Sequence, residues 1–133
     1  MNQNPVYLCL DYGEKHIGVA IATTIIAEPL EVISSTSSLA KIKDFVDKYN
    51  VTDIVIGLSE NITAEKTKYF AKEVSNFISL PIHFHDETLS SQDTRRKLAA
   101  SGLKRSVREA KIDHFVAATI LQDFLDTLSD TII

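Results

Sequence analysis

The chain has one cysteine and no long apolar run, and each shortage excludes a class of protein. A single cysteine cannot form an internal disulfide, which excludes the small secreted folds that depend on such bonds. No apolar run approaches the ~20 residues that a membrane-spanning helix needs. The first five residues are polar and lack the basic and then apolar pattern of a signal peptide. We therefore expect a cytoplasmic protein with no membrane partner.

Length and composition are those of an ordinary globular domain. The 133 residues are 44% hydrophobic and 24% charged, which predicts one domain, 1–133, with a real hydrophobic core. The net charge is −4, but residues 95–111 carry seven basic residues and one acidic residue, a net of +6. Such a segment is a candidate for phosphate contacts, or else simply a solvated surface. No aromatic residue interleaves with it, so we expect no base stacking there.

The stretch that carries the first candidate site is a predicted hairpin. An apolar run from Val6 to Leu10 is followed by Asp11, then by a turn, then by a second run at 17–22. Two apolar runs joined by a short turn that contains glycine are typical of a hairpin. Gly13 would allow a positive φ in this turn. The pattern places Asp11 at the rim of a sheet.

The rest of the chain predicts strands alternating with helices. We expect a third strand at 30–33, a helix at 39–49, a strand at 53–58, a helix after Thr63, a strand at 82–85, a helix from Ser90 to about Ala100 and a last helix from about 112. The order is that of a ribonuclease H-like α/β fold. It predicts a mixed five-stranded sheet of order 3-2-1-4-5, flanked by helices.

Three acidic positions fall at the ends of these elements. Asp11 ends the first strand, the pair Asp86 and Glu87 ends the fifth, and Asp113 begins the last helix. Carboxylates that converge repel one another unless a cation lies between them, and oxygen ligands select Mg²⁺ or Mn²⁺. Such a cluster suits phosphodiester hydrolysis. Taken singly, each residue also has a structural explanation, such as a helix N-terminal acid at Asp113.

Four segments together resemble the YqgF/RuvX family, nucleases of pre-16S rRNA maturation related to Holliday junction resolvases. They are Leu10-Asp11-Tyr12-Gly13-Glu14-Lys15-His16-Ile17-Gly18-Val19-Ala20, Val55-Ile56-Gly57-Leu58, Asp86-Glu87-Thr88-Leu89-Ser90 and 113–122. The resemblance covers nearly the whole chain and implies a ribonuclease H-like fold. It implies that Asp11, Glu87 and Asp113 bind the metal, and it favours Glu87 over Asp86 as the catalytic residue.

The chain departs from this family's pattern at positions that would contact phosphate. His16 and Thr88 stand where the family usually has arginine, and Ser59 replaces a usual proline. The expected nucleic-acid contacts are six candidates for binding backbone phosphates: Lys15, His16, Lys104, Arg105, Arg108 and Lys111.

The working hypothesis is a metal-dependent nuclease acting on pre-rRNA, as a monomer or a homodimer. The alternatives are a Holliday junction resolvase acting on DNA, and a non-catalytic nucleic-acid- or protein-binding module that retains the fold. A phosphotransferase of the actin and hexokinase type would need a second domain. A zinc site at His83 and His85 lacks further ligands, so we expect these histidines to be structural.

Overall fold

The computed structural model describes residues 4–58, 63–86 and 105–130, the last range with side chains only at 115–128. A five-stranded sheet is formed by β1 Tyr7–Tyr12, β2 His16–Ala22, β3 Glu28–Ser34, β4 Asp53–Leu58 and β5 Ile82–Asp86. The helices are α1 Ser38–Tyr49, α2 Ala64–Phe77 and α4 Arg105–Asp130. The strand order is β3-β2-β1-β4-β5, as predicted.

The central strand β1 joins the antiparallel and the parallel parts of the sheet. It pairs antiparallel with β2, with Cys9 opposite Ala20, and parallel with β4, with Cys9 beside Val55. Strand β5 then pairs parallel with β4. Strand β4 is apolar almost throughout because helices cover both of its faces.

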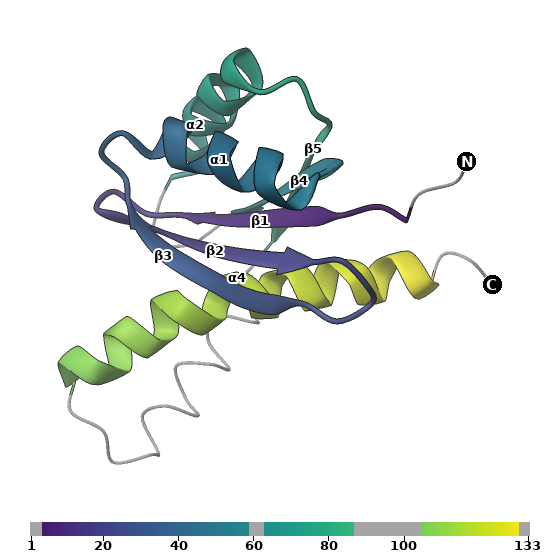
Figure 1. Ribbon diagram of the computed structural model, residues 1–133. Helices are drawn as coiled ribbons and strands as arrows, with labels where there is room; N and C mark the ends of the chain where they lie inside the picture. The colour runs from purple at the N-terminus through teal and green to yellow at the C-terminus, as the bar shows by residue number, and fades with distance from the viewer. Residues whose placement is uncertain (1–3, 59–62, 87–104, 131–133) are drawn as a thin grey trace.

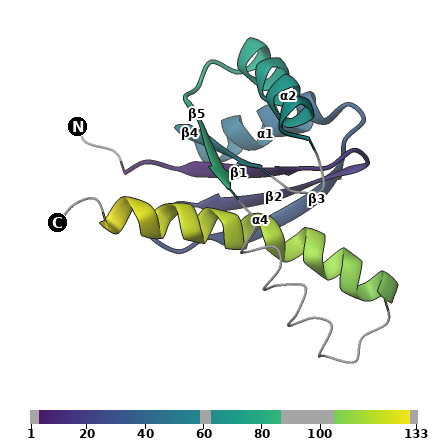
Figure 2. The same ribbon diagram turned by 180° about the vertical axis from the view of Figure 1, so that it is seen from behind.

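Helices cover the two faces of the sheet unequally. Helices α1 and α2 lie on one face, and α4 is the only helix of the described residues along the other, as the opposite views of Figure 1 and Figure 2 show. Successive side chains of a strand point to opposite faces, so the core has two parts. Leu8 and Leu10 of β1 belong to the part under α1 and α2. Cys9 packs instead with Ala117 and Leu121 of α4.

Local sequence signals end and begin the helices where we expected them. Helix α1 ends at Tyr49, and Asn50, with a left-handed backbone (φ 54°), caps it with a hydrogen bond from its N–H group to the Val46 carbonyl. Helix α2 begins after Thr63, whose hydroxyl accepts a hydrogen bond from the Lys66 N–H group. None of the helices described is long and apolar enough to cross a membrane.

Two expectations were wrong. The last helix begins at Arg105, well before the predicted start at 112, because residues 105–111 are mostly good helix formers with no glycine or proline. Gly13 is required for close approach and not for a positive φ. A Cβ atom there would lie 2.6 Å from the carbonyl oxygen of His16. The helix predicted from Ser90 to Ala100 lies outside the described residues.

Candidate active site

Asp11 lies at the edge of the sheet where the three parallel strands end. Leu10 pairs with Ile56 of β4, and Gly57, the next residue of β4, pairs with His85 of β5. Asp11, Gly57 and His85 therefore occupy one level across the three strands. Since parallel strands run in the same direction, their carboxyl ends meet at this edge. The Asp11 side chain is held there by the central strand.

The alternation of side chains decides which acidic residue of β5 shares a face with Asp11. Asp11 is two residues beyond Cys9, which packs against α4, so Asp11 lies on the α4 face. His85 also lies on that face, because its ring contacts Phe124 of α4. Asp86 therefore lies on the opposite face. Glu87, the other acidic candidate of this pair, lies outside the described residues.

Asp113 lies on the helix that crosses this face. Helix α4 begins at the end of the molecule where the β1–β2 turn lies, as Figure 1 shows. Position 113 is one helical turn before Ala117, which is fully buried against the sheet. Asp113 is inside α4, eight residues beyond Arg105, so it is not a helix N-terminal acid. Its side chain is not among those described.

The turn between β1 and β2 is tied to both neighbouring elements. The Ser35 hydroxyl donates a hydrogen bond to the Gly13 carbonyl (2.7 Å), and the Ser35 N–H group donates to the Lys15 carbonyl (2.9 Å). The Lys66 ammonium lies 2.6 Å from the Glu14 carboxylate. The hydrogen bond from Lys66, followed by its positive charge, lowers the pKa of Glu14, and the same contacts raise the pKa of Lys66.

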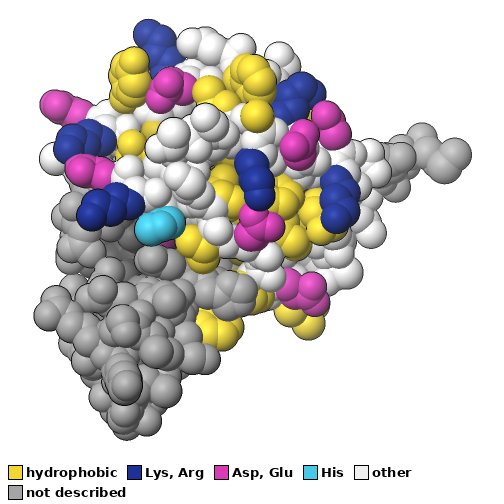
Figure 3. All heavy atoms as spheres, turned by 60° about the vertical axis from the view of Figure 1, so that its left-hand side comes forward, with side chains coloured by type: hydrophobic (Ala, Val, Ile, Leu, Met, Phe, Trp, Pro, Cys, Tyr) yellow, Lys and Arg dark blue, Asp and Glu magenta, His cyan; other side chains and the backbone are white. Residues whose placement is uncertain are grey.

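Two candidate phosphate contacts stand in and beside this turn. The side chains of Lys15 and His16 are exposed, and neither forms an ion pair with a described residue. Because Lys66 neutralises Glu14, Lys15 adds positive charge to this edge. Figure 3, in which the left-hand side of Figure 1 comes forward, shows basic and acidic side chains alternating along one border of the molecule, next to a histidine.

The other basic candidates belong to α4 or precede it. Arg105, Arg108 and Lys111 lie on the first two turns of α4, at the end of the molecule that carries the β1–β2 turn. The predicted helix start near 112 had implied that these residues lie in a loop. They lie instead on the helix. Their side chains are not described, and Lys104 lies outside the described residues.

The two histidines of β5 are paired with aspartates. The His83 Nε2 atom lies 2.9 Å from the Asp53 carboxylate, and the His85 Nε2 atom lies 2.6 Å from the Asp123 carboxylate. No three histidine, cysteine or acidic side chains gather as a metal site among those the structure describes. The pairs support the structural role expected for the histidines. The sequence did not reveal Asp53 and Asp123 as partners, because they lie 30 and 38 residues away from them.

The strand order, helix α4 packed along one face and the carboxylate at the end of the central strand are those of a ribonuclease H-like fold. Two solved structures share this fold. RuvC of T. thermophilus, in complex with a Holliday junction substrate, matches 96% of this chain and 97% of its own (TM-score 0.58, 15% identity). The fowlpox virus Holliday junction resolvase matches 92% and 99% (TM-score 0.53, 12% identity).

Sequence comparison then identifies the family. The profile of the RuvX family, described as Holliday junction resolvase, matches residues 5–127. A protein of Dictyoglomus turgidum named "Putative pre-16S rRNA nuclease" is 34% identical over 92% of this chain and 94% of its own length. A protein of Moorella thermoacetica with the same name is 35% identical over 90% and 93%. The chain belongs to the RuvX family.

Proposed function

We propose that this chain is a single-domain nuclease that hydrolyses phosphodiester bonds of RNA in the maturation of the 5′ end of pre-16S rRNA. The observation that carries the proposal is the position of Asp11, at the carboxyl edge of the sheet and on the face that α4 crosses. The names of the relatives support pre-16S rRNA as the substrate. This substrate would place the protein in the cytoplasm.

The proposed metal ligands are Asp11, Glu87 and Asp113. Asp11 and position 113 belong to elements that pack against each other, and alternation along β5 favours Glu87 over Asp86. Carboxylate oxygens are the ligands that Mg²⁺ and Mn²⁺ prefer, so the donor set fits either cation. When bound, the cations would activate a water molecule and stabilise the leaving oxygen.

The basic residues around this edge would hold the nucleic acid. Lys15 and His16 stand in and beside the turn that follows Asp11, and the start of α4 supplies further cations at the same end. We propose contacts with backbone phosphates from Lys15, His16, Lys104, Arg105, Arg108 and Lys111. Such contacts position a substrate without reading its sequence, and they weaken as salt rises.

The decisive variant is Asp11→Asn, which keeps the shape of the side chain and removes its charge. Cleavage of a pre-16S rRNA fragment in Mg²⁺ should fall by a factor on the order of 100 or more, because a metal ligand is lost. Calorimetry with Mn²⁺ should show weaker metal binding. The matched control is Asp47→Asn on the exposed face of α1, where Asp47 pairs only with Lys43 among described residues. Asp11→Asn cleaving at the wild-type rate would overturn the site assignment.

The substrate is decided by a parallel assay on a four-way DNA junction. We expect cleavage of the rRNA precursor and little cleavage of the junction. Preferential cleavage of the junction would support the resolvase alternative, for which two copies would have to act together on one substrate. Binding of RNA with no cleavage of either substrate would support the non-catalytic alternative.

A further inference from the structure

A hollow lies on the opposite side of the sheet from Asp11, between the first turn of α1 and helix α2. Its volume is about 380 Å³. Polar residues from the start of α1 line one side, and aromatic residues from β1 and α2 line the other. The residues that matter here are Tyr12, Ser37, Ser38, Phe70, Glu73 and Phe77.

The α1 side of the hollow has the character of an anion site. The first N–H groups of a helix lack partners within the helix, and this end carries the positive pole of the helix dipole. The first turn of α1 contains no acidic residue, and the Ser37 side chain makes no capping hydrogen bond. The amide groups of this twelve-residue helix are therefore not neutralised by a neighbouring side chain of the described chain.

Ser38 supplies a second, independent sign of a ligand. The residue is only 6% exposed, and it lines the hollow. Its hydroxyl group makes no hydrogen bond with any residue that the structure describes. A buried hydroxyl without a partner is costly and therefore uncommon in folded proteins. A phosphate oxygen bound in the hollow would supply the missing partner.

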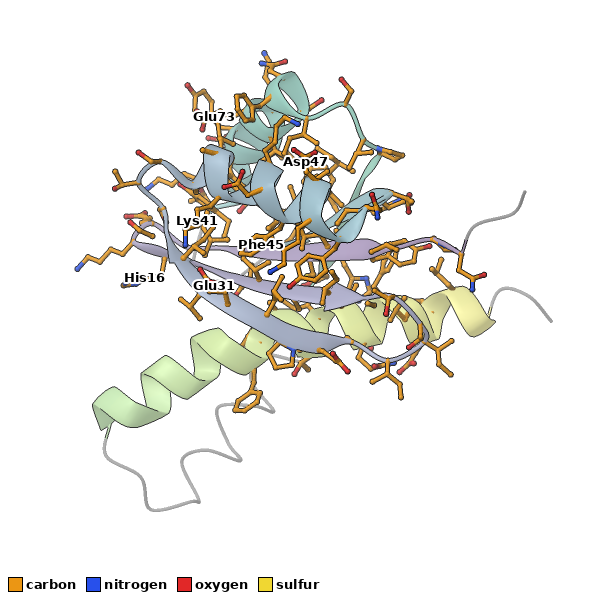
Figure 4. The ribbon with its side chains drawn as sticks, in the orientation of Figure 1. His16, Glu31, Lys41, Phe45, Asp47 and Glu73 are labelled. Atoms are coloured by element: carbon orange, nitrogen blue, oxygen red, sulfur yellow. The ribbon has the colours of Figure 1, made fainter. Side chains whose placement is uncertain are left out.

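The α2 side of the hollow suits a nucleic-acid base. The Phe77 ring is 50% exposed, whereas Phe70 is buried and stacks on Tyr12 with their centres 4.5 Å apart. Exposed aromatic rings are platforms on which unpaired bases stack. Glu73 lies on α2 above the first turn of α1, as Figure 4 shows. Its carboxylate would accept a hydrogen bond from a base amino group, and it repels phosphate toward the α1 side.

We propose that this hollow binds one unpaired nucleotide of the RNA next to the cleavage position. Its phosphate contacts the first turn of α1 and the Ser38 hydroxyl, and its base stacks on Phe77. Tyr12 follows Asp11 directly and faces the opposite side of the sheet, so a strand bound at Asp11 continues over the edge into the hollow. A paired base is stacked inside its duplex and cannot enter. The inference rests on the nuclease function proposed above.

The test measures binding without cleavage, in EDTA, by fluorescence anisotropy. The probes are a labelled single-stranded oligoribonucleotide of about ten nucleotides and the same sequence as a duplex. Phe77→Ala should bind the single strand about tenfold more weakly, because the stacking platform is lost, and should leave duplex binding unchanged. The matched control is Phe84→Ala on β5, a phenylalanine of similar exposure (43%) that does not line the hollow. It should bind both probes as the wild type does.

Ser38→Ala tests the phosphate end. Its affinity for the single strand should fall about tenfold, because a hydrogen bond to a charged phosphate is lost. Its melting temperature should be unchanged or higher, because the native hydroxyl has no partner to lose among the described residues. Three results would each overturn the proposal. The first is wild-type affinity for the single strand in Ser38→Ala or Phe77→Ala, and the second is an equal loss of affinity for single strand and duplex in these variants. The third is that the wild type does not bind the single strand. These outcomes are separate from the loss of cleavage in Asp11→Asn, which tests the nuclease function alone.

Discussion

Ala117→Leu tests how closely α4 must approach the sheet for the proposed site to form. Ala117 has no exposed surface, and it packs with the small residues Cys9 and Ala20 of the sheet. A leucine at this position adds three carbon atoms where no space is left. Overpacking of this kind costs about 1–3 kcal/mol, which corresponds to a melting temperature lower by roughly 4–12 °C for a domain of this size.

The same substitution should affect activity beyond its effect on stability. Position 113 is one turn before Ala117 on α4, so a helix displaced from the sheet carries Asp113 away from Asp11. A displacement of about 1 Å in a catalytic group lowers rates on the order of 100-fold. Single-turnover cleavage of a pre-16S rRNA fragment, measured well below the melting temperature of the variant, separates this effect from unfolding. Urea unfolding gives the free energy of unfolding.

The control for Ala117→Leu is the same change at the next residue. Ala118 is partly exposed, so a leucine there can extend toward solvent. We expect Ala118→Leu to change stability by no more than about 0.5 kcal/mol and to keep the cleavage rate. If Ala117→Leu were as stable and as active as Ala118→Leu, α4 would not be held closely against the sheet. The reasoning that brings Asp113 to Asp11 would then fail.

Three further substitutions test the turn beside the site and the start of α2. Glu14→Gln should remove a pH-dependent contribution to stability. Because the pKa of Glu14 is lowered and that of Lys66 is raised, their ion pair stabilises the fold between about pH 4.5 and 10.5. Urea unfolding at pH 7 and pH 3 in low salt should show the difference from wild type only at pH 7. Gly13→Ala should lower the free energy of unfolding by about 1–3 kcal/mol, since its Cβ would meet the His16 carbonyl; an unchanged value would contradict this contact. Thr63→Ala should cost about 1 kcal/mol in the same assay through loss of the α2 cap, and no loss would show that the cap is dispensable.

The sheet was predictable because its signals are local. The apolar run at 53–58 has the length and composition of a strand covered on both faces, and β4 occupies these residues. Asn50 caps the end of α1 through its preference for a left-handed backbone. Thr63 caps the start of α2 through its side-chain hydroxyl. The place of Asp11 at the rim followed from the point where the apolar run stops. Each of these features depends on a few neighbouring residues.

One local signal was misread, and features set by distant partners escaped the sequence. The start of α4 was misplaced because Ile112 and Asp113 look like a helix start, although the residues before them continue the helix. His83 finds Asp53 only because β5 lies beside β4 in the sheet. The hollow above α1 was not foreseen, because Ser38 and Phe77 come together only when α1 and α2 pack on the same face.

The last two residues of β1 connect the two sites proposed for this protein. Asp11 faces α4 and Tyr12 faces α1 and α2, because consecutive residues of a strand point to opposite faces. The turn that follows them is fastened on one side by Ser35 and on the other by Lys66. A strand of RNA that crosses this edge therefore meets a fixed backbone between its two contacts. If both proposals hold, shifting β1 relative to its neighbours would impair cleavage at Asp11 and single-strand binding at Tyr12 together. Ser38→Ala, in contrast, would weaken single-strand binding far more than it weakens metal binding at Asp11.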